Sequence, residues 1–90
     1  MNYWKQMKRE DVYELIDGER AYQDALGSER VVQSRMARSV CEELVLLQVL
    51  VQRAFEVWVD TPADEEALVM MRKIAAVAVR CMEQHGTSPR

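Results

Sequence analysis

The side chains best suited to chemistry in this sequence are carboxylates, and their clearest cluster is the adjacent pair Glu42 and Glu43. Carboxylates on facing helices can hold Mg²⁺ and support hydrolysis of phosphate esters. Each acidic cluster also has a structural explanation, as a helix cap, as a complement to the helix dipole or as a solvated face. The remaining candidates lie in two other segments: Glu14, Asp17 and Glu19, and Asp64, Glu65 and Glu66.

The Glu42–Glu43 pair resembles one half of the site in MazG-type nucleotide pyrophosphohydrolases, which are all-α enzymes. That family follows the pair with a Glu-x-x-Asp on the next helix. Here Val57 stands three residues before Asp60, and Thr61 stands three residues before Asp64, so the second half does not match. The resemblance implies a reduced Mg²⁺-dependent enzyme, which we keep as the alternative. Our main expectation is a protein with no enzymatic activity and no cofactor.

Two cysteines and one histidine are the other candidate ligands. Cys81 and His85 are four residues apart, hence on one face of a helix, and Cys41 lies near the opposite end of the preceding helix. An antiparallel arrangement would bring these ends together, as a zinc site requires, but a fourth ligand is missing. We therefore expect packing roles for both cysteines and a capping role for His85, with no metal.

Helix start and stop signals, together with the spacing of the hydrophobic residues, predict three helices that position these residues. The first covers about 11–26 and ends at Gly27-Ser28, with Arg20 on its outer face. The second covers about 29–59, and its firm part, 39–59, opens with a Ser39–Glu42 capping box. The third covers about 62–85, with Thr61 as N-cap and Gly86 as its stop.

The middle helix is apolar around more than half of its circumference. We therefore predict an all-α fold, a single domain over 1–90 built on a long antiparallel helical hairpin, which dimerises into a helical bundle. One stripe of the helix contains Val40, Cys41, Leu44, Leu47, Val51, Phe55 and Trp58. A second stripe is assigned to the dimer interface: Leu46, Val49, Leu50 and Val57.

Composition narrows the class of partner. The 90 residues carry a net charge of −3 and are 49% hydrophobic, which argues against nucleic acid as the main ligand. No apolar run approaches the length that spans a bilayer, so we expect no membrane partner and a cytoplasmic protein. A protein partner would use the large or charged groups that the core does not need: Tyr3, Trp4, Tyr13, Arg30, Arg35 and Arg38.

The last helix, with the sequence RKIAAVAVRCMEQHG at 72–86, resembles the ending of a group of short tailed-phage proteins. Their opening is similar to VYELIDGERAYQD at 12–24. The resemblance implies a phage or prophage source, a location in the host cytoplasm and an accessory role. It suggests binding to a host protein, including inhibition of a defence system such as CRISPR; a structural or nucleic-acid-associated phage component is a further alternative.

Overall fold

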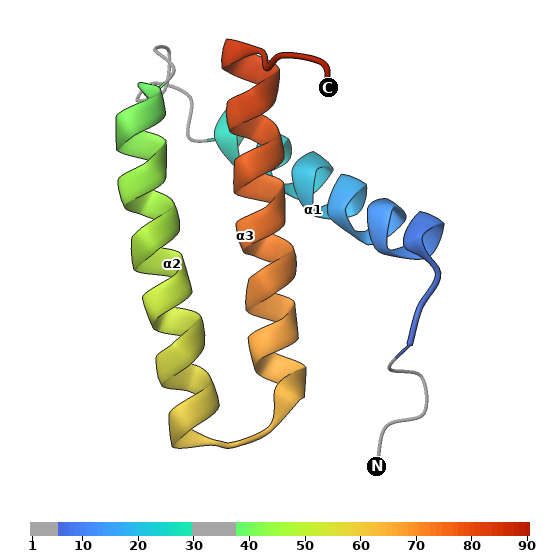
Figure 1. Ribbon diagram of the computed structural model, residues 1–90, viewed down its shortest axis with the longest axis vertical. Helices are drawn as coiled ribbons and strands as arrows, with labels where there is room; N and C mark the ends of the chain where they lie inside the picture. Colours follow the sequence, from blue (N-terminus) through green and yellow to red (C-terminus); the bar gives the residue numbers. More distant parts are fainter. Residues whose placement is uncertain (1–5, 30–37) are drawn as a thin grey trace.

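The computed structural model describes residues 6–29 and 38–90, and it shows three helices (Figure 1). They are α1 (Arg9–Glu29), α2 (Val40–Asp60) and α3 (Asp64–His85). Within these two ranges all regular structure is helical. The prediction of an all-α protein with three helices is confirmed.

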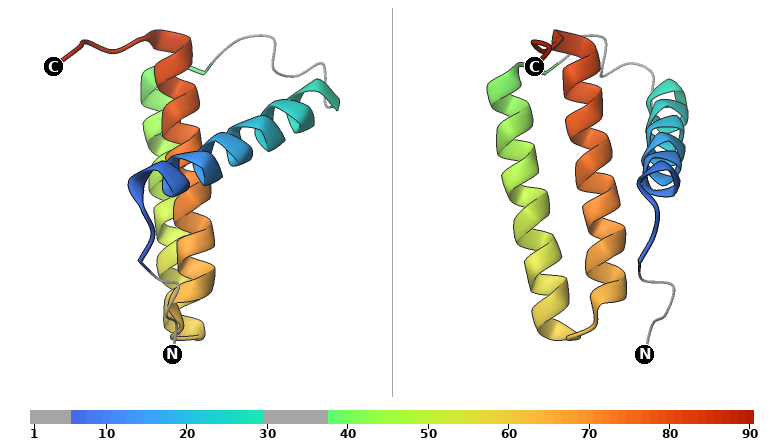
Figure 2. Two further views of the ribbon diagram at one scale, coloured as in Figure 1. Left: turned by 90° about the vertical axis from the view of Figure 1, so that its right-hand side faces the viewer. Right: turned by 45° about the vertical axis from the view of Figure 1, so that its right-hand side comes forward.

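Two of the helices lie side by side and the third crosses them. α2 and α3 run in opposite directions, joined by residues 61–63, and α1 passes obliquely across one side of α3 (Figures 1 and 2). Across the described ranges α1 contacts α3 but makes no contact with α2. α3 is therefore the central helix, the one that contacts both of the others.

Local signals explain where α2 begins. The Ser39 side chain accepts a hydrogen bond from the Glu42 N–H at 3.1 Å, and the Glu42 carboxylate accepts one from the Ser39 N–H at 2.8 Å. This is the capping box that the sequence predicts, and it satisfies two N–H groups that the first turn leaves free.

The start of α3 differs from the prediction. Ala63, not Thr61, is the N-cap residue, and it contributes no side-chain hydrogen bond. Thr61 instead terminates α2, because its N–H is bonded to the Val57 carbonyl. α3 then begins at Asp64, two residues later than predicted.

The first helix is longer than predicted. α1 continues through Gly27 and Ser28 to Glu29, so the predicted stop at these residues is wrong. Glycine in a helix costs about 1 kcal/mol relative to alanine, which neighbouring helical residues can outweigh. Most of the segment predicted to lead into the firm part of helix two falls on residues 30–37, outside the described part.

At the other end of the chain, Gly86 stops α3 as predicted, with φ 79° and its N–H bonded to the Met82 carbonyl.

The core is small. Only Leu50, Ala76 and Val77 are buried hydrophobic residues among those described, and two of the three belong to α3. The radius of gyration is 14.6 Å, whereas a compact chain of this length would have roughly 12 Å. The three helices therefore form an open arrangement in which much apolar surface stays in water.

Candidate protein-interaction surfaces

Exposed apolar side chains dominate the surface. Seventeen large hydrophobic residues within the described ranges are exposed, against three buried hydrophobic ones. Single exposed hydrophobic residues are normal in soluble proteins, but contiguous apolar patches mark sites of association. The question is therefore how these side chains are grouped.

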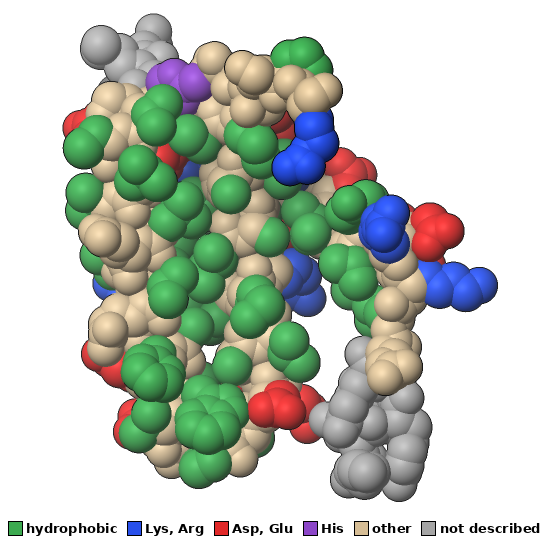
Figure 3. All heavy atoms as spheres, viewed as in Figure 1, with side chains coloured by type: hydrophobic (Ala, Val, Ile, Leu, Met, Phe, Trp, Pro, Cys, Tyr) green, Lys and Arg blue, Asp and Glu red, His purple; other side chains and the backbone are tan. Residues whose placement is uncertain are grey.

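One group forms a continuous surface along the antiparallel pair, which we name the α2–α3 face. Hydrophobic side chains gather along both helices in the view of Figure 3. Several are strongly exposed, including Leu44 at 57%, Val51 at 53% and Phe55 at 61%. On α2 the face consists of Val40, Leu44, Leu47, Val51, Ala54, Phe55 and Trp58. On α3 it consists of Ala67, Met71, Ile74, Ala78 and Cys81.

A buried ion pair fixes the register of the two helices near one end of this face. Glu43 of α2 is only 1% exposed, and its carboxylate lies 3.2 Å from Nη2 of Arg80 on α3. Arg38 lies further out, with Nη1 at 3.7 Å from the same carboxylate. The buried negative charge of Glu43 is thus compensated by two arginines, as burial of a charge requires.

Two further polar contacts tie the ends of α2 and α3 together. At the Glu43 end, Nε2 of His85 lies 2.8 Å from the Arg38 carbonyl oxygen. Since a carbonyl only accepts, this ring nitrogen must carry the proton. At the loop end, the Trp58 indole N–H donates to the Asp64 carboxylate at 3.2 Å. Both contacts hold the ends of the pair together.

The residues predicted for a dimer interface lie on a different face of α2. Leu46, Leu50 and Val57 follow Glu43 by three, seven and fourteen residues, so they share the side that meets α3. Leu50 is buried inside the chain, at 7% exposed, and so is not available to a partner; Leu46 and Val57 are half-buried. Val49 is 41% exposed on the opposite side. The free apolar surface is therefore the first stripe of the sequence analysis, not the second.

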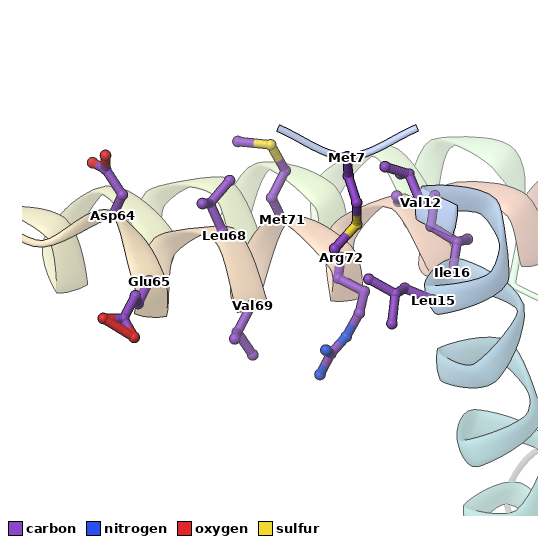
Figure 4. Close-up of a pocket in the computed structure, with 11 residues that line it drawn as sticks. Met7, Val12, Leu15, Ile16, Asp64, Glu65, Leu68, Val69, Met71 and Arg72 are labelled. Atoms are coloured by element: carbon purple, nitrogen blue, oxygen red, sulfur yellow. The ribbon is translucent and has the colours of Figure 1, made fainter. Parts of the chain in front are cut away.

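A second apolar surface is a hollow between α1 and α3, with a volume of about 600 Å³. We name it the α1–α3 hollow. Figure 4 shows Val12, Leu15 and Ile16 of α1 beside Arg72, with Met7 at the same end. The lining is mostly apolar, with two acids at the far end: Met7, Val12, Leu15, Ile16, Asp64, Glu65, Leu68, Val69, Met71, Arg72 and Ala75.

Ion pairs hold α1 against α3 beside this hollow. Arg20 makes a bidentate contact with Glu83, Nε–Oε2 2.9 Å and Nη2–Oε1 2.6 Å, and also reaches Asp24 at 3.0 Å. The hydrogen bond from Arg20 lowers the pKa of Glu83 and the same bond raises the pKa of Arg20. Arg20, predicted to face outward, is in fact only 8% exposed.

A second pair compensates Arg72, the one cationic side chain of the described residues that lines the hollow. Nε of Arg72 lies 3.2 Å from Oε1 of Glu19. The acids Asp64 and Glu65 lie at the other end of the hollow, and no cationic side chain from 6–29 or 38–90 lines that end. The net character of the hollow is therefore apolar with an acidic end.

Two of the six residues predicted to bind a partner, Tyr13 and Arg38, lie in the described part of the chain, and both are exposed. Tyr13 is 62% exposed on α1, as a contact residue would be. The Arg38 side chain is 53% exposed and also takes part in the Glu43 ion pair. Tyr3, Trp4, Arg30 and Arg35 lie outside the described residues.

The ion pairs of Arg20 with Glu83 and of Glu43 with Arg80 were missed, because they join residues 63 and 37 positions apart and no local pattern marks them.

The two acids of the candidate site, Glu42 and Glu43, take part in separate structural contacts. Glu42 closes the capping box, where the hydrogen bond from the Ser39 backbone lowers its pKa. Glu43 is paired with Arg80. In the part of the chain that the structure describes, no three His, Cys, Asp or Glu side chains are grouped as metal ligands would be. Cys41 is exposed and Cys81 half-buried, and both thiols are free.

Comparisons with protein-family models, with curated proteins and with solved structures give no match for this chain. In addition, none of the helices in the described ranges has an apolar stretch long enough to cross a membrane. The fold and the two surfaces thus define the class of protein: a small all-α chain whose apolar side chains lie mainly outside its own core.

Proposed function

We propose that this protein has no catalytic activity and acts by binding another protein. The observation that carries the proposal is the imbalance between three buried and seventeen exposed hydrophobic residues within the described ranges. Because exposed apolar area costs about 25 cal/mol per Å² relative to burial, a chain with this distribution gains stability when another molecule covers it. The polar groups that could have formed an acid site instead cap α2 and pair with arginines.

The α1–α3 hollow is the surface that best fits a foreign protein. Its volume of about 600 Å³ is enough for several large apolar side chains presented by one segment of a partner. The acidic end at Asp64 and Glu65 favours a partner that carries Lys or Arg next to its apolar side chains. The partner segment is therefore an amphipathic helix with a basic residue at one end of its apolar face.

The resemblance to tailed-phage proteins gives this proposal its biological setting. We propose that the chain is a phage accessory protein which works in the host cytoplasm, and that its partner is a host protein, such as a component of a defence system like the CRISPR machinery. The chain acts as a homodimer. Tyr13 follows Val12 of the hollow and is exposed, which is compatible with a role at the edge of the partner contact, whereas Arg38 is exposed at the Glu43 end of α2.

The test is capture of partners from host lysate with tagged wild-type protein and two matched variants. Val69 lines the hollow and is 48% exposed; Val45 lies on the outer side of α2 and is 54% exposed. We expect one host protein to be recovered by wild type and by V45E, and to be lost with V69E. Equal recovery by V69E, or no recovery above a tag-only control, would contradict the proposal.

The alternative that the protein is a pyrophosphohydrolase is tested by an activity assay. Incubation of the protein with nucleoside triphosphates and Mg²⁺ should release no pyrophosphate above a buffer control. Release that depends on Glu43 would show that the acidic residues work as a site, since the proposed function gives Glu43 only a structural role. Retention of nucleic acid in a salt-dependent mobility shift would favour the third alternative.

A further inference from the structure

We infer that a second copy of this chain covers the α2–α3 face, and that the two copies close a four-helix bundle in which α2 of each copy lies over α3 of the other. The inference rests on the homodimer named in the proposed function and supplies its geometry. Of the residues that define this face, only Met71 also lines the α1–α3 hollow, so the two surfaces are neighbours that use mostly different side chains.

Positions along this face have the spacing of a bundle seam on both helices, and all of them are apolar except His85 at the end of α3. On each helix they recur at alternating steps of four and three residues, which is the knobs-into-holes pattern of left-handed bundles. The α2 seam is Val40, Leu44, Leu47, Val51, Ala54 and Trp58. The α3 seam is Ala67, Met71, Ile74, Ala78, Cys81 and His85.

The two seams are in register with one another. Glu43 contacts Arg80, so Leu44 and Cys81 lie at nearly the same level of the antiparallel pair. Stepping along both helices from there gives six levels, each with one residue of each seam, from Val40 with His85 to Trp58 with Ala67. The spacing of the two sequences thus builds a complete set of layers.

The layers combine large and small side chains. Leu44 lies level with Cys81, Leu47 with Ala78, and Trp58 with Ala67. At another level the order is reversed, with Ala54 on α2 and Met71 on α3. A twofold axis parallel to the helices sets the large residue of one copy against the small residue of the other at every such level. Cores fill space in this way when facing positions alternate in size.

The area of the face is close to what a stable dimer needs. α2 has 21 residues, so the face is about 30 Å long, and two packed helices are about 20 Å wide. Its footprint of roughly 600 Å², increased by the relief of the side chains, approaches the ~800 Å² per partner of a standard interface. Neither seam contains an Asp, Glu, Lys or Arg, so two copies bring no like charges together.

A matched pair of valines on α2 tests the arrangement by sedimentation equilibrium. Val51 is 53% exposed in the α2 seam, and Val45 is 54% exposed on the outer side of the same helix. We expect wild type and V45K to sediment with twice the mass of one chain, and V51K with the mass of one chain at the same concentration. A wild-type protein that is monomeric at all concentrations, or a V51K variant as dimeric as V45K, would overturn the inference.

A second measurement covers the case in which V51K fails to fold. The melting temperature of a dimer that unfolds to free chains rises with protein concentration, whereas that of a monomer does not. We expect the wild-type melting temperature to rise by several degrees over a hundredfold increase in concentration, and a constant value would overturn the dimer. A monomer that still captures a host protein through Val69 refutes the dimer alone, and a dimer that captures none refutes the proposed partner alone.

Discussion

Replacement of Glu43 by Gln should destabilise the protein strongly. Glu43 is 1% exposed and faces Arg80, whose side chain is 23% exposed. The variant keeps the shape of the side chain but removes the carboxylate that Arg80 contacts. Breaking a buried ion pair from one side costs about 3–5 kcal/mol. Because Arg80 can turn partly to water, we expect the lower end, about 3 kcal/mol, which lowers the melting temperature of a domain of this size by more than about 10 °C.

The assay is thermal and urea unfolding followed by circular dichroism, at one fixed chain concentration because association contributes to stability. E42Q is the matched control. Glutamine also completes a capping box, so this neighbouring acid should be replaceable with little change in melting temperature. Equal effects of E43Q and E42Q would refute the reasoning.

A double replacement separates the pair from its packing. Exchange of Glu43 for Leu together with Arg80 for Met removes both charges and retains most of the volume. Apolar replacement of a whole buried pair is often neutral or stabilising. We therefore expect the double variant to unfold within about 1 kcal/mol of wild type or above it. A double variant as unstable as E43Q would show that the contact contributes more than compensation of buried charge.

Three further predictions concern the helix ends and α1. S39A should cost about 1 kcal/mol in urea unfolding, because it removes the side-chain half of the capping box. G18A should stabilise by up to about 1 kcal/mol, because Gly18 is helical and an added Cβ meets no atom within 4 Å. Arg20 lowers the pKa of Glu83, so this contact stabilises the fold above the ordinary carboxyl pKa, and the stabilisation is lost as pH falls from about 5 through the lowered value. E83Q should flatten that acid dependence, and an unchanged pH profile would contradict the assignment.

Local signals in the sequence were sufficient for the helix ends that depend on neighbouring residues. The capping box of Ser39 and the glycine stop at Gly86 involve atoms within four residues of one another, and both were predicted correctly. Thr61 was assigned to the wrong helix because the same short segment carries signals for both an end and a start, and the hydrogen bond to the Val57 carbonyl decides between them.

The spacing of hydrophobic residues on α2 could not predict which of its apolar stripes packs on α3. α2 has two adjacent stripes, and either could pack on α3. In the structure, Glu43 meets Arg80 on the same side of α2 that buries Leu50, and Val51 stays exposed. The period predicts that an apolar surface exists, whereas the packing of α2 on α3 shows which residues form it.

Helix geometry also explains why the two acids of the candidate site, Glu42 and Glu43, point in different directions. Glu42 and Glu43 are adjacent in sequence, but successive residues on a helix point about 100° apart. One side chain therefore turns back to the N-cap and the other turns inward to Arg80. Adjacent acids on a helix do not converge on one ion unless other helices supply the remaining ligands.

The most direct test of the central claim is an isotope-filtered nuclear Overhauser experiment on a mixture of labelled and unlabelled chains. Filtering keeps only contacts between different copies. We predict cross-peaks from the methyl groups of Leu47 and Val51 in one copy to those of Ile74 and Ala78 in the other. Absence of any intermolecular cross-peak from these methyl groups, at a concentration where the chain is folded, would contradict the account.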